Sequence, residues 1–359
     1  MSTNTIDLAR EGFRRAPTHA ERVHEAAQLF ARGRSGASIL SQAVLLEAFT
    51  TDDFPGLLGD AFQRQAIAAY KDTPFEFDGI LTDVTVDDFK RRKLVDLWGA
   101  DAFEPVGQGE EYKGASLSET EVEHGTGKYG KAYGLTWELL RARDFSGLAN
   151  FPRALGNGAV KGQNNAVADL LVADGGWNPE FFGTVETAPL NETNLDAAIR
   201  ALSTRENHRG ELVPTDQLVL VHGPALRAQV NRLLKATELE WKDTSGSRTT
   251  TTKTPNPFAN VVTPLESRTV GARLGTNGGT GWALVQGNGS DLPSIVRTLL
   301  SGHPDVDIRV KRDQGQSVAG GDIPVDQGSF KDDTIWYRGR AVHGIDPAFT
   351  TGVYASNGA

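Results

Sequence analysis

A long strand-like region that lacks an apolar face of its own is the feature that most constrains how this chain can fold. From 79 to 140 the sequence alternates as β-strands do, which predicts an extended hairpin with arms at 84–98 and 117–137. Within the second arm, residues 118–123 read Ser-Glu-Thr-Glu-Val-Glu, so carboxylates alternate with little apolar material. An isolated two-stranded ribbon is only marginally stable in water. This arm is therefore expected to become ordered against another molecule.

The strongest helical signal in the chain follows at about 147–173. Asn150 can cap this helix and Pro152 suits its first turn. Apolar residues repeat along it at spacings of seven and four: Leu148, Leu155, Ala159, Ala166 and Leu170. Three glycines lie inside it: Gly156, Gly158 and Gly162. Each glycine costs ~1 kcal/mol relative to alanine, so the helix is expected to hold only when packed, with its glycines permitting close backbone approach.

Weaker signals complete the outline. The N-terminal part reads as helical pieces, the first of them preceded by a capping box at Thr18 and Glu21. A region from 191 to about 289 looks α/β, with a buried strand at 217–221 and a polar loop at 243–257, which is rich in Ser, Thr and Pro. Two further strands are expected: 282–285 and 306–310. The chain is expected to end in a polar tail.

Charge and composition exclude several classes of protein. The chain has no cysteine, so neither disulfides nor thiolate chemistry can operate in it. The formal net charge is −9, which argues against a protein that grips nucleic acid with a broad basic face. No stretch approaches the roughly 18 apolar residues that span a bilayer, and residues 1–15 carry charges where a secretory signal would be apolar. The chain is expected to stay in the cytoplasm where it is made, with no membrane partner.

Chemical motifs are weak throughout. Gly125, Gly127 and Gly130 match the spacing of a dinucleotide-binding loop, but such a loop must lead into a helix, and here a strand is predicted. A turn or bulge is favoured, and the alternative of a nucleotide-dependent enzyme is testable by calorimetry with nucleotides. No histidine pair has the spacing of a helical metal site, and serine nucleophile elbows and phosphate-binding loops are missing. We predict no catalytic residues, no cofactor and no metal.

Charged residues of both signs gather in the predicted hairpin. The densest basic run is Lys90, Arg91, Arg92 and Lys93. Further along lie Glu110, Glu111, Lys113, Glu119, Glu121 and Glu123. One interpretation is a solvated surface in which neighbours pair with each other. The other is that these residues are inter-subunit contacts, and because exposed pairs contribute only ~0 to 1 kcal/mol each, they would then set register and partner choice.

Several local sequences resemble one known family. They are Asp53-Phe-Pro-Gly-Leu-Leu, Asp88-Phe-Lys, Glu110-Glu-Tyr-Lys-Gly, Leu117-Ser-Glu, Tyr129-Gly-Lys, Pro152-Arg-Ala-Leu-Gly, Leu218-Val-Leu-Val-His-Gly-Pro and Arg340-Ala-Val-His-Gly-Ile-Asp-Pro. Together with the order of the elements they resemble the Mu-type major head subunits of tailed bacteriophages, whose fold is the Hong Kong 97 type capsid fold. The resemblance extends over roughly residues 50–350.

The resemblance implies an α+β fold and a place in it for each segment. These are an N-terminal helical extension and N-arm at 1–78, an extended E-loop hairpin with flanking peripheral-domain strands at 79–138, a peripheral domain with a long spine helix at 139–190, an axial domain at 191–300, peripheral-domain return strands at 301–334 and a C-terminal segment at 335–359. Some relatives carry a cleaved scaffold segment or Lys–Asn cross-links between subunits, and the sequence nominates neither here.

The function implied is that of a major capsid protein, not an enzyme, which self-assembles into the pentamers and hexamers of an icosahedral shell around a phage genome. Expected partners are other copies of the chain, scaffold, portal, and head-completion or decoration proteins, with packaged double-stranded DNA contacted loosely. The expected location is the virion capsid, and the host cytoplasm during assembly. Alternatives are the shell of an encapsulin-like nanocompartment, which shares the fold and stores enzymes, and a minor structural or decoration protein of the phage.

Overall fold

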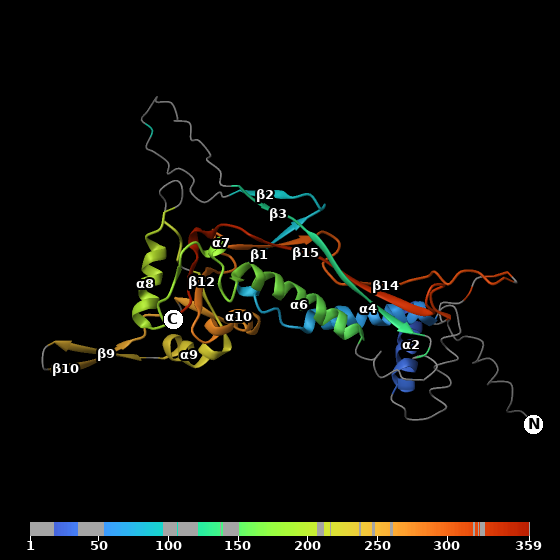
Figure 1. Cartoon of the computed structure of the whole chain (residues 1–359), viewed down its shortest axis with the longest axis horizontal. Coiled ribbons are helices and arrows are strands. Elements are labelled where there is room, and N and C mark those ends of the chain that lie inside the picture. The colour runs from blue at the N-terminus through green and yellow to red at the C-terminus, as the bar shows by residue number, and fades with distance from the viewer. Residues whose placement is uncertain are drawn as a thin grey trace, which may run out of the picture. The chain divides into compact units, whose positions relative to one another are not determined.

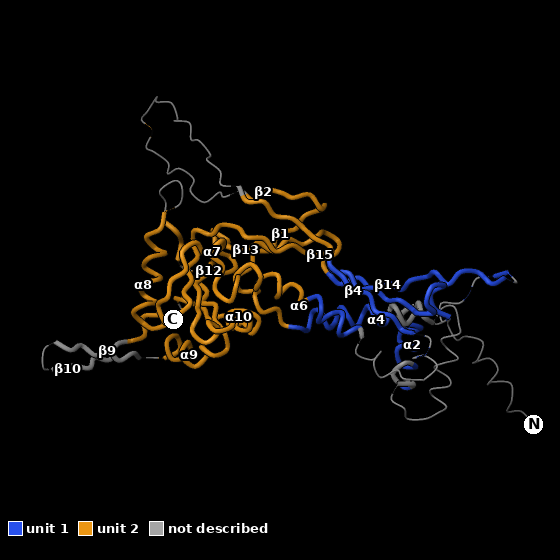
Figure 2. Tube along the Cα trace, viewed as in Figure 1, with its two compact units in different colours: residues 1–73, 129–159, 305–341 blue, residues 74–128, 160–304, 342–359 orange. Residues whose placement is uncertain are grey.

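The structure is a computed structural model that describes residues 18–34, 54–95, 106, 121–136, 138, 151–206, 212–215, 217–236, 238–245, 248–258, 261–318, 320–321, 323 and 327–358. Parts of the predicted N-terminal extension and the hairpin tip at 96–120, apart from Val106, lie outside these residues. The chain divides into two compact units (Figure 2). Unit 1 comprises residues 1–73, 129–159 and 305–341, and unit 2 comprises residues 74–128, 160–304 and 342–359.

Unit 1 packs helices on one face of a small sheet (Figure 1). Its helices are α2 (His19–Arg34), α4 (Phe54–Asp72) and the first part of α6 (Phe151–Leu171). Its strands are β14 (Asp307–Val310), most of β4 (Gly127–Thr136) and the first part of β15 (Thr334–Pro347), and both β4 and β14 pair with β15. The Phe62 ring of α4 meets the Tyr337 ring edge-on at 5.5 Å, and Leu155 of α6 lies against Gly339. Since Tyr337 and Gly339 share one face of β15, both helices cover that face.

The glycines of α6 differ from one another in their surroundings. A Cβ at Gly156 would run into the carbonyl oxygen of Ala66 and lie 2.9 Å from the backbone nitrogen of Tyr70, both in α4. The prediction of close backbone approach is therefore confirmed at this position. It is wrong at Gly158 and Gly162, because a Cβ there would have no neighbour within 4 Å among the described atoms.

Unit 2 contains two main sheets. In the first, β1 (Leu81–Val86) runs parallel to β13 (Ile295–Leu300), and β13 is antiparallel to the last part of β15. The second has the order β11 (Val262–Glu266), β8 (Leu218–His222), β12 (Trp282–Gln286), β16 (Tyr354–Ser356) and β7 (Val185–Glu186). Parallel and antiparallel pairings and helices thus mix in an α+β architecture, as predicted. Strands β8, β12 and β14 confirm the predictions at 217–221, 282–285 and 306–310.

Both faces of the second sheet are buried, which explains why β8 reads as a continuous apolar run. Leu218 and Leu220 pack into one cluster with α8 (Glu192–Ser203) and α9 (Arg227–Lys235). Val219 and Val221 pack into another with the end of α6, α7 (Pro179–Phe182) and α10 (Arg268–Arg273). The remaining short elements of unit 2 are η1 (Asp78–Ile80), β5 (Val172–Ala173), β6 (Gly176–Trp177), η3 (Pro224–Leu226), η4 (Gly275–Gly279) and η6 (Thr350–Gly352).

The hairpin is shorter than the alternation predicted. Residues 84–86 belong to β1, whose backbone pairs with β13, and 127–136 form β4, which pairs with β15. Within the described residues, only β2 (Arg92–Val95) and β3 (Glu121–His124) pair with each other as hairpin arms. The flanking parts pair with other strands of the same chain. Period-2 alternation indicates a strand but does not specify its partner strand, so this pairing could not be predicted.

Two further expectations are wrong. The polar loop at 243–257 is largely a strand pair, β9 (Glu238–Ser245) with β10 (Arg248–Pro255), in antiparallel register. Its threonines are β-branched and favour extended backbone despite their polarity. The polar tail is also structured: β16 pairs with β12 and β7, and Ser356 is fully buried. None of the described helices is both long enough and apolar enough to cross a bilayer.

Candidate functional site

The root of the hairpin is attached to unit 2 through apolar contacts. Leu94 and Val122 are cross-strand partners in β2 and β3. Both pack against one buried cluster: Val213, Leu292, Val296, Ala348 and Phe349. The expectation that the predicted hairpin becomes ordered only against another molecule is therefore wrong for the root. For the tip it stays a prediction, because the tip lies outside the described residues.

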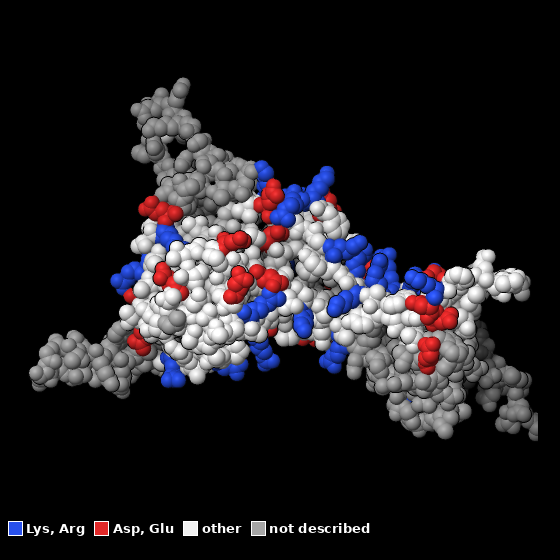
Figure 3. Space-filling model, viewed as in Figure 1, with Lys and Arg blue, Asp and Glu red and all other residues white. Residues whose placement is uncertain are grey.

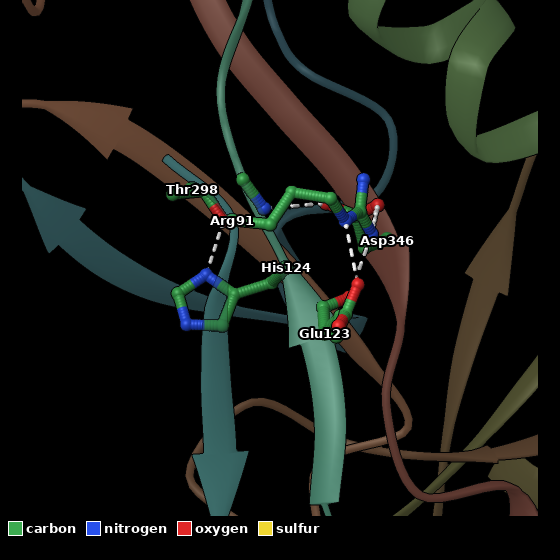
Figure 4. Close-up of polar contacts among 6 residues, drawn as sticks. Arg91, Glu123, His124, Thr298 and Asp346 are labelled. Atoms are coloured by element: carbon green, nitrogen blue, oxygen red, sulfur yellow. Dashed lines mark hydrogen bonds and ion pairs between the residues drawn. The ribbon is translucent and has the colours of Figure 1, made fainter. Parts of the chain in front are cut away.

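Arg91 holds the two hairpin strands together at their base (Figure 4). Its Nη2 donates to the backbone oxygen of Glu123 at 2.9 Å, and its Nε lies 3.3 Å from Glu123 Oε2. The same Nη2 donates to Asp346 Oδ1 of β15 at 3.1 Å. Charge-assisted bonds of this kind are stronger than neutral ones. One guanidinium thus links the residue before β2, the end of β3 and the sheet.

Gly125, directly after β3, is held on both sides of its backbone. Its N–H donates to Asp346 Oδ2 at 3.1 Å. Its carbonyl oxygen lies so close to Gly344 that a Cβ on Gly344 would collide with it. Gly344 and Asp346 are two residues apart in β15, so they share one face of that strand. Glycine is required at 344 because any side chain there would displace the carbonyl.

His124 anchors the end of β3 to β13. Its Nδ1 lies 2.9 Å from Thr298 Oγ1, and the residue is 4% exposed. Burial lowers the pKa of His124 below the ordinary value, against an opposing effect of the Asp346 carboxylate. The neutral imidazole therefore persists in the folded chain at physiological pH. Thr298 and Gly344 are cross-strand partners in the sheet. His124 and Gly125 therefore contact the two members of one residue pair.

The structure places the two arginines of the predicted basic run in contacts within the chain. Arg91 pairs with Glu123 and Asp346, and Arg92 Nη2 lies 3.6 Å from Asp88 Oδ2. Lys90 and Lys93 are exposed, and no ion pair of Lys90 occurs within the described ranges. Neighbour pairing thus accounts for both arginines and for Glu123.

The predicted acidic residues are only partly described. Glu121 pairs through its backbone with Val95. Three other glutamates, Glu110, Glu111 and Glu119, lie outside the described residues, as does Lys113. Sequence reasoning missed Asp346, Gly344 and Thr298. A quoted motif, Arg340-Ala-Val-His-Gly-Ile-Asp-Pro, contained two of them, but nothing local connects this motif to Gly125.

The glycine spacing at 125–130 leads into a strand. β4 begins at Gly127 and includes Gly130, so no helix begins directly after these glycines. Gly130 lies against the carbonyl oxygen of Gly339 in β15, where a Cβ would be only 2.5 Å away. At Gly125 and Gly130 the backbone therefore lies close to β15, while the predicted turn or bulge stays a prediction. In the part of the chain that is described, no group of three or more His, Asp or Glu side chains could hold a metal ion.

A cationic face lies on the side of the unit 1 sheet opposite the helices. It consists of Arg309, Arg338 and Arg340, and Figure 3 shows Lys and Arg side chains gathered over β4 and β14. Asp307 lies 2.9 Å from Arg309 Nε and 2.8 Å from Arg340 Nη2. Arg338 is directly opposite Arg309 in the β14–β15 register and has no ion pair with any described residue. Because like charges directly opposite destabilise a sheet, this face is suited to an anionic partner.

Comparison with known proteins places the chain among capsid proteins. Residues 119–356, more than half of the chain, match the family described as phage capsid protein. A virus-like particle from Pyrococcus furiosus is similar at a TM-score of 0.44 and 10% identity, covering 83% of this chain and 98% of that one. The bacteriophage PhiM1 mature capsid is similar at 0.42 and 12%, covering 79% and 88%. The empty GTA particle capsid is similar at 0.40 and 13%, covering 77% and 87%. No curated protein sequence matches the chain.

Proposed function

The chain belongs to the phage capsid protein family, and we propose that within this family it is the major capsid protein of a tailed bacteriophage. As a capsid protein it is a structural component of the virion and not an enzyme. The observation that carries the proposal is the family match over 119–356, which begins two residues before β3 and includes the last strand, β16. The major capsid protein is the component that forms the shell itself.

We assign the fold to the Hong Kong 97 type and the subfamily to the Mu-type head subunits. In that assignment the hairpin within 79–138 is the E-loop, α6 is the spine helix of a peripheral domain, and 191–300 form most of an axial domain. The N-arm lies within 1–78, the return strands at 301–334 and the C-terminal segment at 335–359. Copies would form pentamers and hexamers, aided by scaffold and portal proteins and completed by head-completion or decoration proteins.

The proposed contact between copies is made by the hairpin. Its tip carries Glu110, Glu111 and Glu119, and its root is seated on the copy from which it emerges. The cationic face of another copy, with Arg338 opposite Arg309, has the complementary charge. Each exposed ion pair contributes ~0 to 1 kcal/mol, so these charges set the register of the contact. Many such contacts around a closed shell add up to slow dissociation.

A net charge of −9 is consistent with a container that touches packaged DNA loosely. Strong attraction between wall and phosphates would hinder packaging and release. Free subunits are therefore expected to bind duplex DNA weakly at physiological ionic strength.

Deletion of residues 100–115, closed by a short Gly-Ser linker, tests the proposed function. We expect soluble subunits with the wild-type circular dichroism spectrum that fail to form shells in electron micrographs, while the full chain forms them. A control chain replaces 100–115 with a Gly-Ser segment of equal length, which keeps the reach of the hairpin and removes its side chains. It should also fail to assemble. Normal shells from the deletion would refute the proposal, and shells that enclose a protein cargo rather than DNA would favour a nanocompartment.

A further inference from the structure

One carboxylate connects both strands of the hairpin to the sheet below them. Asp346 Oδ2 accepts from the backbone N–H of Gly125 at 3.1 Å, which holds the end of β3. Asp346 Oδ1 accepts from Arg91 Nη2 at 3.1 Å, which holds the approach to β2. The side chain of Asp346 is 16% exposed, so water screens these bonds less than it would at the surface. A hairpin attached at two points cannot rotate about either one alone.

The other contacts at the root of the hairpin support the same geometry. Gly344 admits the carbonyl of Gly125, and Thr298, the cross-strand partner of Gly344, contacts His124. Leu94 and Val122 add apolar contact but no direction, because hydrophobic packing is non-directional. The angle between hairpin and sheet is therefore determined by the polar contacts.

We propose that Asp346 is a positioning residue that sets the direction in which the hairpin leaves its own unit, and so the curvature of the assembled shell. The inference rests on the proposed function, because direction matters only if the hairpin reaches another copy. The root includes the last described residue of β2, Val95, and the first of β3, Glu121, so it sets the direction in which the chain leaves unit 2 at both points.

The substitution Asp346→Asn isolates this role, since it keeps the size and shape of the side chain. The asparagine amide offers one acceptor oxygen, while Gly125 N–H and Arg91 both present donors. One of the two attachments must be lost in either amide orientation. We expect folded subunits whose yield of closed shells of wild-type diameter falls at least tenfold, with open sheets, tubes or shells of mixed diameter in electron micrographs.

Two control variants separate positioning from stability. Asp88→Asn breaks an exposed ion pair with Arg92 in the same hairpin without touching the sheet, and it should assemble normally. Asp83→Asn replaces a carboxylate to which Arg297 donates at 2.6 and 2.7 Å, and so weakens an ion pair that joins β1 to β13. It should lower the urea midpoint yet give shells of wild-type diameter at permissive temperature.

The outcomes are distinguishable. If the wild-type chain forms no shells, the proposed function fails, and the question of direction does not arise. If Asp346→Asn forms closed shells of normal diameter and yield, the positioning role is refuted. It is also refuted if Asp83→Asn, at equal loss of stability, misassembles in the same way. Should Asp346→Asn not fold, Arg91→Gln decides, because it removes the β2 attachment and leaves the Gly125 bond intact.

Discussion

Alanine substitutions at two glycines of α6 separate helix propensity from packing. Replacing Gly158 should stabilise the chain by about 0.5 to 1 kcal/mol, since a Cβ there meets no described neighbour and alanine is the better helix former. Replacing Gly156 brings the same propensity gain. Its Cβ, however, would press on the Ala66 carbonyl and lie 3.0 Å from the Ala69 Cβ. Overpacking of this kind costs roughly 1 to 3 kcal/mol, because the α4 backbone can yield only by shifting the helix.

The propensity term cancels between the two variants, so their difference reports the packing alone. Gly156→Ala should be less stable than Gly158→Ala by about 1 to 3 kcal/mol. Urea unfolding of dissociated subunits, followed by circular dichroism, measures both variants against the wild type. Equal slopes against urea would show that the compactness of the two end states is unchanged. If both alanines shift the midpoint upward by the same amount, the close approach of α4 and α6 is not as described.

Two other predictions concern protonation and capping. Burial, and to a lesser extent Arg297, lowers the pKa of His343 to about 4, so between pH 6.5 and 4 the unfolded chain takes up a proton that the folded chain does not. The free energy of unfolding should therefore fall over that window by on the order of 3 kcal/mol from this group. The urea midpoint of His343→Gln should fall less between pH 7 and pH 4.5 than that of the wild type. An equal fall in the two chains would contradict the lowered pKa of His343. Thr18 Oγ1 accepts from Glu21 N–H at 3.3 Å and Glu21 Oε2 accepts from Thr18 N–H at 2.6 Å, which confirms the predicted capping box. Thr18→Ala should cost about 1 kcal/mol of helix α2, visible as faster amide exchange in its first turn, whereas Gln28→Ala in the same helix should not change exchange there.

Local patterns identified most of the elements but not their partners. The apolar run at 217–221 became β8, because a fully buried strand needs no polar face. Within the described residues, the alternation predicted between 84 and 137 is divided among four separate strands: β1, β2, β3 and β4. Strands β2 and β3 pair with each other, whereas β1 pairs with β13 and β4 with β15, so these two partner strands come from elsewhere in the chain.

The structure of two polar segments also could not be predicted from the sequence. The threonine-rich stretch in β10 and the short β16 both have the polar composition of a loop or tail, because polar residues usually lie at the surface. Ser356 is buried all the same, and its hydroxyl donates to the Ala188 carbonyl at 2.6 Å. A buried polar group is stable when it is hydrogen-bonded, and such a partner cannot be predicted from composition.

What the sequence alone determined is the kind of molecule: an α+β chain with a charged hairpin, a long glycine-bearing helix and motifs resembling those of capsid proteins. What only the tertiary structure decided is how the hairpin is held. Arg91 and Asp346 are 255 positions apart, and they meet because β15 passes under the end of β3. Helical and strand periods act over a few residues, whereas the pairing of distant strands depends on the packing of the whole chain.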